Sequence, residues 1–168
     1  LVIAWAMENK HVAWDELIDC TPTHPNRGRV VGRLIYDDHT CGELSPMGII
    51  INSSNIGATQ IGSRLDRAEW QQYFRHFGFC RKTEIGLPGE VPGARPGGIA
   101  GIAKISDRGL LKYTGPSLSF GYELNVTAVQ LARAYLTLLS GRERELRLLA
   151  GITVDGKWNP APPASQAD

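Results

Sequence analysis

A hydroxyl and a carboxamide lie two residues apart in the stretch Ile51–Gly57, at Ser53 and Asn55. Acyl transfer through a serine needs a base, an acid that protonates the leaving amine, and groups that hold the substrate amide. A hydroxyl and a carboxamide on a tight connection between two helices can face one cleft and supply the last two functions. The stretch therefore contains two candidate catalytic residues.

The same stretch has a purely structural interpretation, which is helix capping. Ser53 or Ser54 can be the N-cap of a helix that begins near Ile56, because a hydroxyl at that position accepts a backbone N–H. We interpret Ser54 as the cap. For Ser53 and Asn55 the residues alone leave capping and catalysis open.

Helices are predicted on both sides of this stretch. Ser45–Pro46 is an N-cap followed by proline at the first helical position, and it predicts a short helix over 47–51. Apolar residues recur with a helical period from Ile56 to Leu65. Asp66 with Glu69 three residues later is a capping pattern for the next helix, which Gly78 ends. The apolar face of that helix consists of Trp70, Tyr73, Phe74 and Phe77.

A capping box at Thr127 and Gln130 predicts a further helix over 128–140, ended by Gly141. We expect its apolar residues to join the core with the Trp70, Phe74 and Phe77 face. These residues are Val129, Ala132, Leu136 and Leu139. The other predicted elements are a helix at 1–9, small strands at 29–32, 33–36 and 146–154, and a Gly/Pro-rich loop at 86–101.

The composition is that of one globular domain, with 168 residues, 42% hydrophobic residues, 21% charged residues and a formal net charge of +1. No run of five or more Lys and Arg occurs, which argues against nucleic acid or anionic lipid as a partner. No apolar stretch approaches the roughly 18 residues of a membrane span. The three cysteines and four histidines lack the spacings of a zinc site. Cys20 and Cys41 bracket a short stretch of turn residues, and the sequence leaves open whether they form a disulfide or are reduced.

Four segments resemble the transpeptidase domain of penicillin-binding proteins, in the order and spacing of that family. Ile51–Gly57 is similar to its S-x-N box. Phe77–Phe79 and Gly86–Glu90 match its next two segments. Ser119–Tyr135 looks like the stretch that leads into its TxxQLAxAY helix. An S-x-N triplet alone is a weak signal, but four segments in register over about residues 40–140 are a strong one.

The resemblance implies that Ser53 relays a proton toward the leaving group and that Asn55 hydrogen-bonds the substrate backbone and the active-site lysine. The family uses two further boxes, S-x-x-K and K-T-G, and neither occurs in the sequence. We expect the nucleophile box to lie immediately before Leu1. Lys82–Thr83 is followed by Glu84, so we interpret Lys82 as a surface residue. This chain alone is therefore expected to be inactive.

The family usually has Gly where this chain has Glu123. If that position has a positive φ, a glutamate there costs about 1–2 kcal/mol. This departure is the feature that favours a non-catalytic sensor relative over an enzyme. A third alternative is a serine β-lactamase-like hydrolase, which the Gly/Pro-rich loop and the TxxQLAxAY-like helix fit less well.

The resemblance implies a mainly α fold with minor β: the helical lobe of a D,D-transpeptidase/β-lactamase-like α+β domain, with most of the sheet absent. We expect a partial transpeptidase domain at 1–158 and a flexible tail at 159–168. The implied protein is a peptidoglycan D,D-transpeptidase of class B type that needs no metal and no cofactor. Its expected partners are peptidoglycan stem peptides, β-lactams, and proteins of cell division or elongation. Its expected place is the periplasmic side of the bacterial envelope, with the parent protein anchored in the inner membrane and no membrane contact from this chain.

Overall fold

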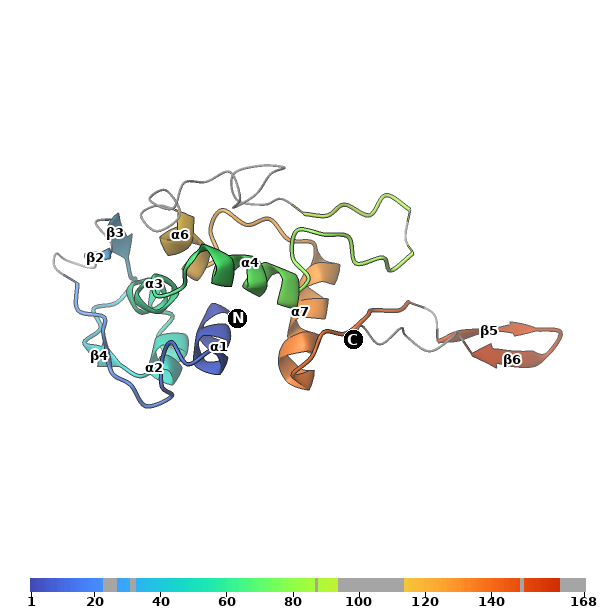
Figure 1. Cartoon of the computed structure of the whole chain (residues 1–168), viewed down its shortest axis with the longest axis horizontal. Helices are drawn as coiled ribbons and strands as arrows, with labels where there is room; N and C mark the ends of the chain where they lie inside the picture. The colour runs from blue at the N-terminus through green and yellow to red at the C-terminus, as the bar shows by residue number, and fades with distance from the viewer. Residues whose placement is uncertain (23–26, 31–32, 87, 94–113, 149, 161–168) are drawn as a thin grey trace. The chain divides into compact units, whose positions relative to one another are not determined.

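Short helices are the main regular elements of the fold, as seen in a computed structural model that describes residues 1–22, 27–30, 33–86, 88–93, 114–148 and 150–160 (Figure 1). The chain divides into two compact units, Leu1–Tyr73 with Ala94–Asn125, and Phe74–Gly93 with Val126–Asp168. The mainly α character with minor β agrees with the sequence prediction.

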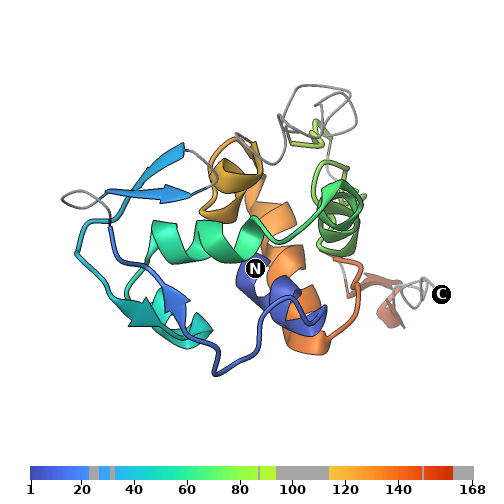
Figure 2. The same cartoon turned by 60° about the vertical axis from the view of Figure 1, so that its left-hand side comes forward.

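The first unit is built around helix α3, which spans Asn55–Gly62. Helices α1, α2 and α6 and the strands β2 and β3 all contact α3, and Figure 2 shows the β2–β3 hairpin beside it. The small residues Gly57, Ala58 and Gly62 are buried and allow this close approach. The elements around α3 are α1 (Val2–Glu8), β1 (Ile18–Asp19), β2 (Arg27–Val30), β3 (Arg33–Tyr36), β4 (Glu43–Leu44), α2 (Pro46–Ile51) and α6 (Gly115–Ser119).

The strands form two antiparallel pairs in this unit, β1 with β4 and β2 with β3. Strand β3 confirms the strand predicted at 33–36, and β2 includes residues 29 and 30 of the strand predicted at 29–32, whose residues 31 and 32 lie outside the described residues. The two-residue strands β1 and β4 were not predicted. Tyr36 ends β3, and this strand end lies against the N-terminus of α3.

The predicted helix caps are present. Ser45 Oγ accepts the N–H of Gly48 at 3.2 Å, with Pro46 opening α2. Asp66 and Glu69 cap helix α4, Arg67–His76, reciprocally, each carboxylate accepting the other residue's N–H. The predicted apolar face of this helix is buried, since Trp70, Phe74 and Phe77 have exposed fractions of 1%, 8% and 2%.

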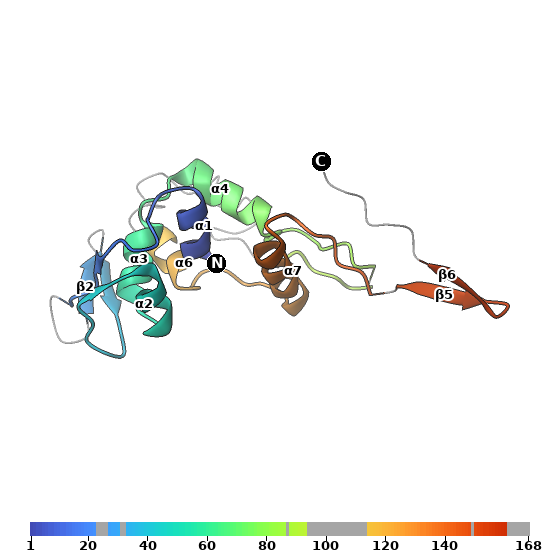
Figure 3. The ribbon, with the colours of Figure 1, turned by 90° about the horizontal axis from the view of Figure 1, so that it is seen from below.

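The second unit contains helix α7 and a hairpin. Helix α7 spans Ala128–Ser140, the Thr127–Gln130 capping box is formed, and Gly141 ends the helix with a left-handed φ of +68°. Strands β5 (Gly151–Val154) and β6 (Lys157–Pro160) pair antiparallel, and Figure 3 shows them as a separate hairpin. Residues 159 and 160 of the expected tail thus belong to a strand, and 161–168 lie outside the described residues.

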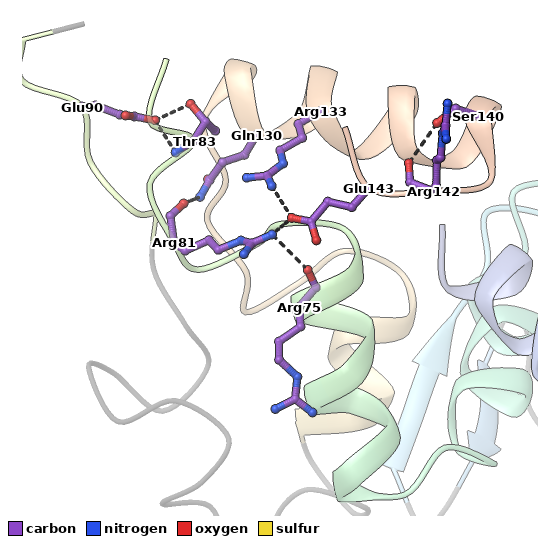
Figure 4. A network of polar contacts seen from close by, with 9 residues as sticks. All are labelled: Arg75, Arg81, Thr83, Glu90, Gln130, Arg133, Ser140, Arg142 and Glu143. Carbon is purple, nitrogen blue, oxygen red and sulfur yellow. Dashed lines mark hydrogen bonds and ion pairs between the residues drawn. The ribbon is translucent and has the colours of Figure 1, made fainter. Parts of the chain in front are cut away.

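The predicted apolar core face of α7 is wrong. Leu136 and Leu139 are 43% and 82% exposed, and the buried side chains are instead Gln130, Arg133, Ala134 and Thr137. Two of these side chains, Gln130 and Arg133, bind acceptors in the same unit. Figure 4 shows that Gln130 Nε2 donates to the carbonyl of Arg81 and that the Glu143 carboxylate pairs with Arg81 and Arg133. Gln130 Nε2 also donates to the carbonyl of Pro92.

No helix in the described part of the chain is both long and apolar enough to span a bilayer. The described cysteines, Cys20, Cys41 and Cys80, are all free thiols. Of the two alternatives left open for Cys20 and Cys41, the structure therefore has the reduced one. Lys82 is exposed, in agreement with its interpretation as a surface residue.

Candidate active site

A tight turn joins α2 to α3 (Figure 3). Ser53 lies in this turn, between the C-cap Asn52 of α2 and the N-cap Ser54 of α3. The N–H of Ser53 donates to the carbonyl of Ile50 at 3.2 Å, and the N–H of Ser54 donates to the carbonyl of Ile49 at 3.0 Å. These two bonds are the Schellman pattern that closes a helix. The residue that reverses the chain direction in this pattern is usually glycine, and here it is Ser53.

Ser53 has a φ of +53° and an exposed side chain. A left-handed backbone conformation costs a residue with a Cβ about 1–2 kcal/mol, which Gly would avoid. Non-glycine residues held in such conformations cluster at functional sites. Ser53 therefore has an unfavourable backbone conformation, and because its side chain is exposed, packing does not explain why a serine is present. Its hydroxyl is accessible to solvent.

Ser54 has the opposite environment, because its side chain is only 2% exposed. Its Oγ accepts the N–H of Gly57 at 3.0 Å, which makes it the N-cap of α3. The same hydroxyl donates to Oδ2 of Asp37 at 2.6 Å. The capping prediction for Ser54 is confirmed, and its single proton is already committed to a protein acceptor.

Asp37 completes the cap, and the sequence did not single it out. This residue follows β3, is 4% exposed, and accepts the N–H groups of Asn55 and Ile56 on Oδ1 at 2.6 and 3.0 Å. The sequence marked Asp37–Asp38 only as a turn. The three residues that bond Asp37 lie 17, 18 and 19 positions further along the chain, so no short-range motif reveals the contacts.

The carboxamide of Asn55 is anchored on one side. Its Nδ2 donates to the carbonyl of Tyr36 at 2.7 Å, and its backbone N–H donates to Asp37. Among the described residues its Oδ1 accepts no hydrogen bond. A carboxamide whose amide nitrogen is held by the protein presents a fixed oxygen, which can accept an N–H from a substrate or an ammonium group.

Ile49 and Cys20 pack closely against Gly57 in the first turn of α3. A Cβ on Gly57 would stand 2.6 Å from Cγ1 of Ile49 and 2.7 Å from Sγ of Cys20, so only glycine fits. Burial raises the pKa of the Cys20 thiol, which keeps it protonated and a poor nucleophile. Cys20 is therefore a packing residue at this site and not a reactive thiol.

The site as described has an accessible hydroxyl and an oriented carboxamide. It lacks a nucleophile paired with a base, because neither an S-x-x-K nor a K-T-G box is in the sequence. Among the described residues, no three His, Cys, Asp or Glu side chains gather as metal ligands do. The arrangement can therefore relay a proton and orient an amide, and it needs a serine nucleophile to act on.

Glu123, which stands where the family usually has Gly, has a left-handed backbone conformation. Its φ is +64° and its side chain is exposed. The preceding turn is closed by the N–H of Tyr122, which donates to the carbonyl of Ser117 at 2.9 Å. The glutamate thus adopts the left-handed conformation that a glycine takes without strain.

Comparison with known proteins agrees with the motif order. A model of the penicillin binding protein transpeptidase domain matches residues 1–167. Over 138 residues the chain is 28% identical to peptidoglycan D,D-transpeptidase FtsI of Escherichia coli K12, covering 82% of this chain and 21% of that protein. Over 104 residues it is 31% identical to the probable peptidoglycan D,D-transpeptidase PbpC of Pseudomonas aeruginosa, covering 62% and 17%. The chain spans about a fifth of the length of these curated relatives.

Solved structures show the same fold. The apo TP domain of Burkholderia pseudomallei penicillin-binding protein 3 matches with a TM-score of 0.75 and 25% identity, over 96% of this chain and 45% of that one. Penicillin-binding protein 3 of Mycobacterium tuberculosis, complexed with ampicillin, matches with a TM-score of 0.77 and 25% identity, over 96% and 34%.

Proposed function

This chain belongs to the penicillin-binding protein transpeptidase family, and from that premise we propose that its parent protein cross-links peptidoglycan by serine acyl transfer. In this proposal the turn between α2 and α3 is the second active-site motif of the parent. The observation that carries it is the contrast between the two serines, since Ser53 is exposed and strained while Ser54 is buried and fully bonded.

The reaction has two acyl transfers. A serine outside this sequence attacks the carbonyl of the penultimate D-Ala in a stem peptide, and the terminal D-Ala leaves as an amine. The acyl group then passes from that serine to the amine of a second stem peptide. With a β-lactam, the same serine opens the ring and the ring nitrogen is the leaving group.

Ser53 and Asn55 serve the first transfer in this proposal. The leaving nitrogen needs a proton as its bond to the carbonyl breaks, and the Ser53 hydroxyl passes one to it. Asn55 Oδ1 accepts a hydrogen bond from the substrate backbone or from the lysine of the nucleophile box. The exposure of Ser53 and the anchored amide of Asn55 support these roles.

The substrates and the location of the parent follow from the same premise. We assign it stem peptides ending in D-Ala-D-Ala as substrates and β-lactams as inhibitors, which fits the ampicillin complex of the Mycobacterium tuberculosis neighbour. We place the transpeptidase domain on the periplasmic side of the bacterial envelope, with the parent anchored in the inner membrane and assembled with proteins of division or elongation.

The sensor alternative rests on Glu123, and the structure gives it no further support. The positive φ of Glu123 gives it the local backbone cost expected of a glutamate in place of Gly, and this cost alone does not prevent acyl transfer. The hydrolase alternative differs from a transpeptidase only in the fate of the acyl-enzyme. Slow deacylation in water with faster transfer to an amine acceptor distinguishes the transpeptidase.

Labelling with a fluorescent penicillin tests the proposal. We expect the full-length parent to give a covalent, denaturation-resistant fluorescent band on a gel, and this 168-residue chain to give none. No band from the folded parent would contradict the proposed function. A band from the chain alone would contradict the inference that the nucleophile lies outside it.

A further inference from the structure

The segment that joins α1 to β1 can be followed in Figure 1, and it carries a tryptophan that is exposed to solvent. Residues 13–16 form a β-turn, which the N–H of Glu16 closes by donating to the carbonyl of Ala13 at 3.3 Å. Trp14, a central residue of this turn, is 74% exposed, and Leu17, just after the turn, is 61% exposed. We propose that residues 13–17, the Trp14 turn, are a docking surface for a protein partner with an apolar pocket rimmed by basic side chains.

The turn itself does not explain the tryptophan. Turns favour Pro, Gly, Asn, Asp and Ser for their backbone and hydrogen-bonding properties, and Asp15, the other central residue, is of this kind. Single exposed apolar side chains are common on protein surfaces, but here two large ones lie three residues apart at one turn. Tryptophan is among the residue types enriched at the hot spots of protein interfaces. The exposure of Trp14 and Leu17 therefore fits binding better than it fits a structural role.

The Trp14 turn is braced at its base. The Glu16 carboxylate accepts the N–H of Ala13 at 3.2 Å and pairs with Arg64 at 2.7 Å. Arg64 also donates to the carbonyl of His11 at 2.7 Å, and the ring of His11 pairs with the carboxylate of Glu69 in α4. All of these residues belong to the first unit. A braced turn loses little conformational freedom when it binds, and this favours association.

The charge near Trp14 indicates the chemistry of the partner. Among the charged side chains that are exposed between residues 8 and 19, Glu8, Asp15 and Asp19 are acidic and Lys10 is basic. Acidic groups around an apolar anchor attract a surface of opposite charge, which adds specificity and speeds association. The same acidic excess repels a bilayer of anionic lipids, and it makes the turn repel a second copy of itself. The surface that complements it is therefore an apolar pocket with a basic rim.

Photocross-linking in the cells that make the full-length parent tests the proposal. The probe is the benzophenone side chain of Ala13→p-benzoylphenylalanine, at an exposed position beside Trp14. We expect one protein adduct, with mass spectrometry placing the link in an apolar segment flanked by Lys and Arg. Trp14→Ser and Leu17→Ser should each remove that adduct. Trp158→Ser is the matched control and should retain it, because it changes a tryptophan that is 59% exposed on β6.

The purified partner then gives the affinity for the full-length parent. Trp14→Ser should weaken binding about 30-fold or more, which is the loss that marks a hot spot. Raising the salt concentration from about 0.05 to 0.5 M should weaken binding of the wild type, and it should weaken binding of Asp15→Lys less, because salt screens the attraction between exposed charges.

Penicillin acylation separates this docking surface from the proposed acyl transfer, which uses none of its residues. Trp14→Ser should acylate and melt like the wild type, because its side chain is exposed. The absence of any adduct would overturn the proposal, as would an adduct that joins the turn only to the parent itself or to a second copy. An adduct that persists in both Trp14→Ser and Leu17→Ser, or that lies in an acidic segment, would also overturn it. Trp14-dependent binding to vesicles of phosphatidylglycerol and phosphatidylethanolamine would assign the turn to a membrane surface instead.

Discussion

Ser53 and Ser54 are neighbours in the sequence, yet within the described part of the chain only Ser54 gives its hydroxyl proton to a protein acceptor, Oδ2 of Asp37 at 2.6 Å. A serine hydroxyl carries one proton, and a proton already donated inside the protein is not free for a leaving group. Ser53 has a left-handed backbone and an exposed side chain. The two serines therefore differ in role: the Ser54 hydroxyl stabilises the turn, and the Ser53 hydroxyl is exposed to solvent.

Ser53→Gly should make the domain more stable and less active. Glycine removes the cost of φ +53°, so the free energy of unfolding should rise by about 1 kcal/mol, or roughly 2–4 °C in melting temperature. The acylation rate should fall as in Ser53→Ala, since the hydroxyl is lost. Thermal unfolding and penicillin acylation of the same preparation check both parts.

Gly141→Ser is the matched control for this prediction. Gly141 ends α7 with a φ of +68°, and a Cβ there would meet nothing within 4 Å. The substitution should lower stability by about 1 kcal/mol and leave acylation unchanged. A Ser53→Gly protein that is less stable than the wild type would mean that the Ser53 hydroxyl has a structural partner.

Glu123→Gly should also stabilise the protein, by about 1 kcal/mol, because glycine tolerates the φ of +64°. Acylation by penicillin should stay within about threefold of the wild type, because nothing in the proposed relay of protons uses this side chain. Urea unfolding and the acylation rate constant measure the two effects. A large gain in acylation on Glu123→Gly would instead support the sensor alternative, in which this glutamate impairs turnover.

Thr127→Ala should cost about 1 kcal/mol of stability, because the hydroxyl that accepts the N–H of Gln130 at 3.2 Å is lost. Gln130→Ala should cost more, about 2–3 kcal/mol, since it also leaves the carbonyls of Arg81 and Pro92 without their donor. Thr127→Ser keeps the cap and is the control. Activity should fall only through unfolding, and slow acylation in a fully folded Thr127→Ala protein would mean that this residue contacts substrate.

Glu90 should make stability depend on pH in the acid range. The hydroxyl of Thr83, with the N–H groups of Thr83 and Glu84, lowers the pKa of Glu90 below its ordinary value of 4.5. The folded state therefore binds this proton less readily than the unfolded state does. The stabilisation is present above pH 4.5 and is lost as the pH falls through the lower folded-state value.

Urea unfolding of wild type and Glu90→Gln at pH 7 and at pH 3 measures this effect. The loss of stability between the two values should be smaller in Glu90→Gln. An identical pH dependence in wild type and Glu90→Gln would show that the loop around Glu90 does not hold this carboxylate.

The local signals in the sequence predicted most of the helices. Ser45, Asp66 and Thr127 each cap the helix predicted to follow them, because a cap needs only a partner three residues away. The same local logic identified Ser54 as a cap, and it left Ser53 open between capping and catalysis. The hairpin β5–β6 was predicted only as a strand over 146–154, although Asp155–Gly156 is a typical two-residue turn and both residues have positive φ.

Long-range contacts account for what the sequence did not predict. Asp37 reaches the turn of Ser53 from the end of another element, and nothing near it in the sequence indicates this. On α7 the buried Gln130 and Arg133 bind carbonyls and a carboxylate, whereas a search for apolar periodicity assumes an apolar partner. The roles of Ser53 and Asn55 came from the family resemblance, and they remain a proposal.

The acylation rate constant of Ser53→Ala in the full-length parent tests the central claim most directly. A proton relay acts in the transition state, so the rate constant should fall about 10²- to 10⁴-fold, with the non-covalent dissociation constant of the penicillin nearly unchanged. The loss should exceed that of Ser54→Ala. A Ser53→Ala protein that acylates within about threefold of the wild type, while Ser54→Ala loses all labelling, would contradict the account.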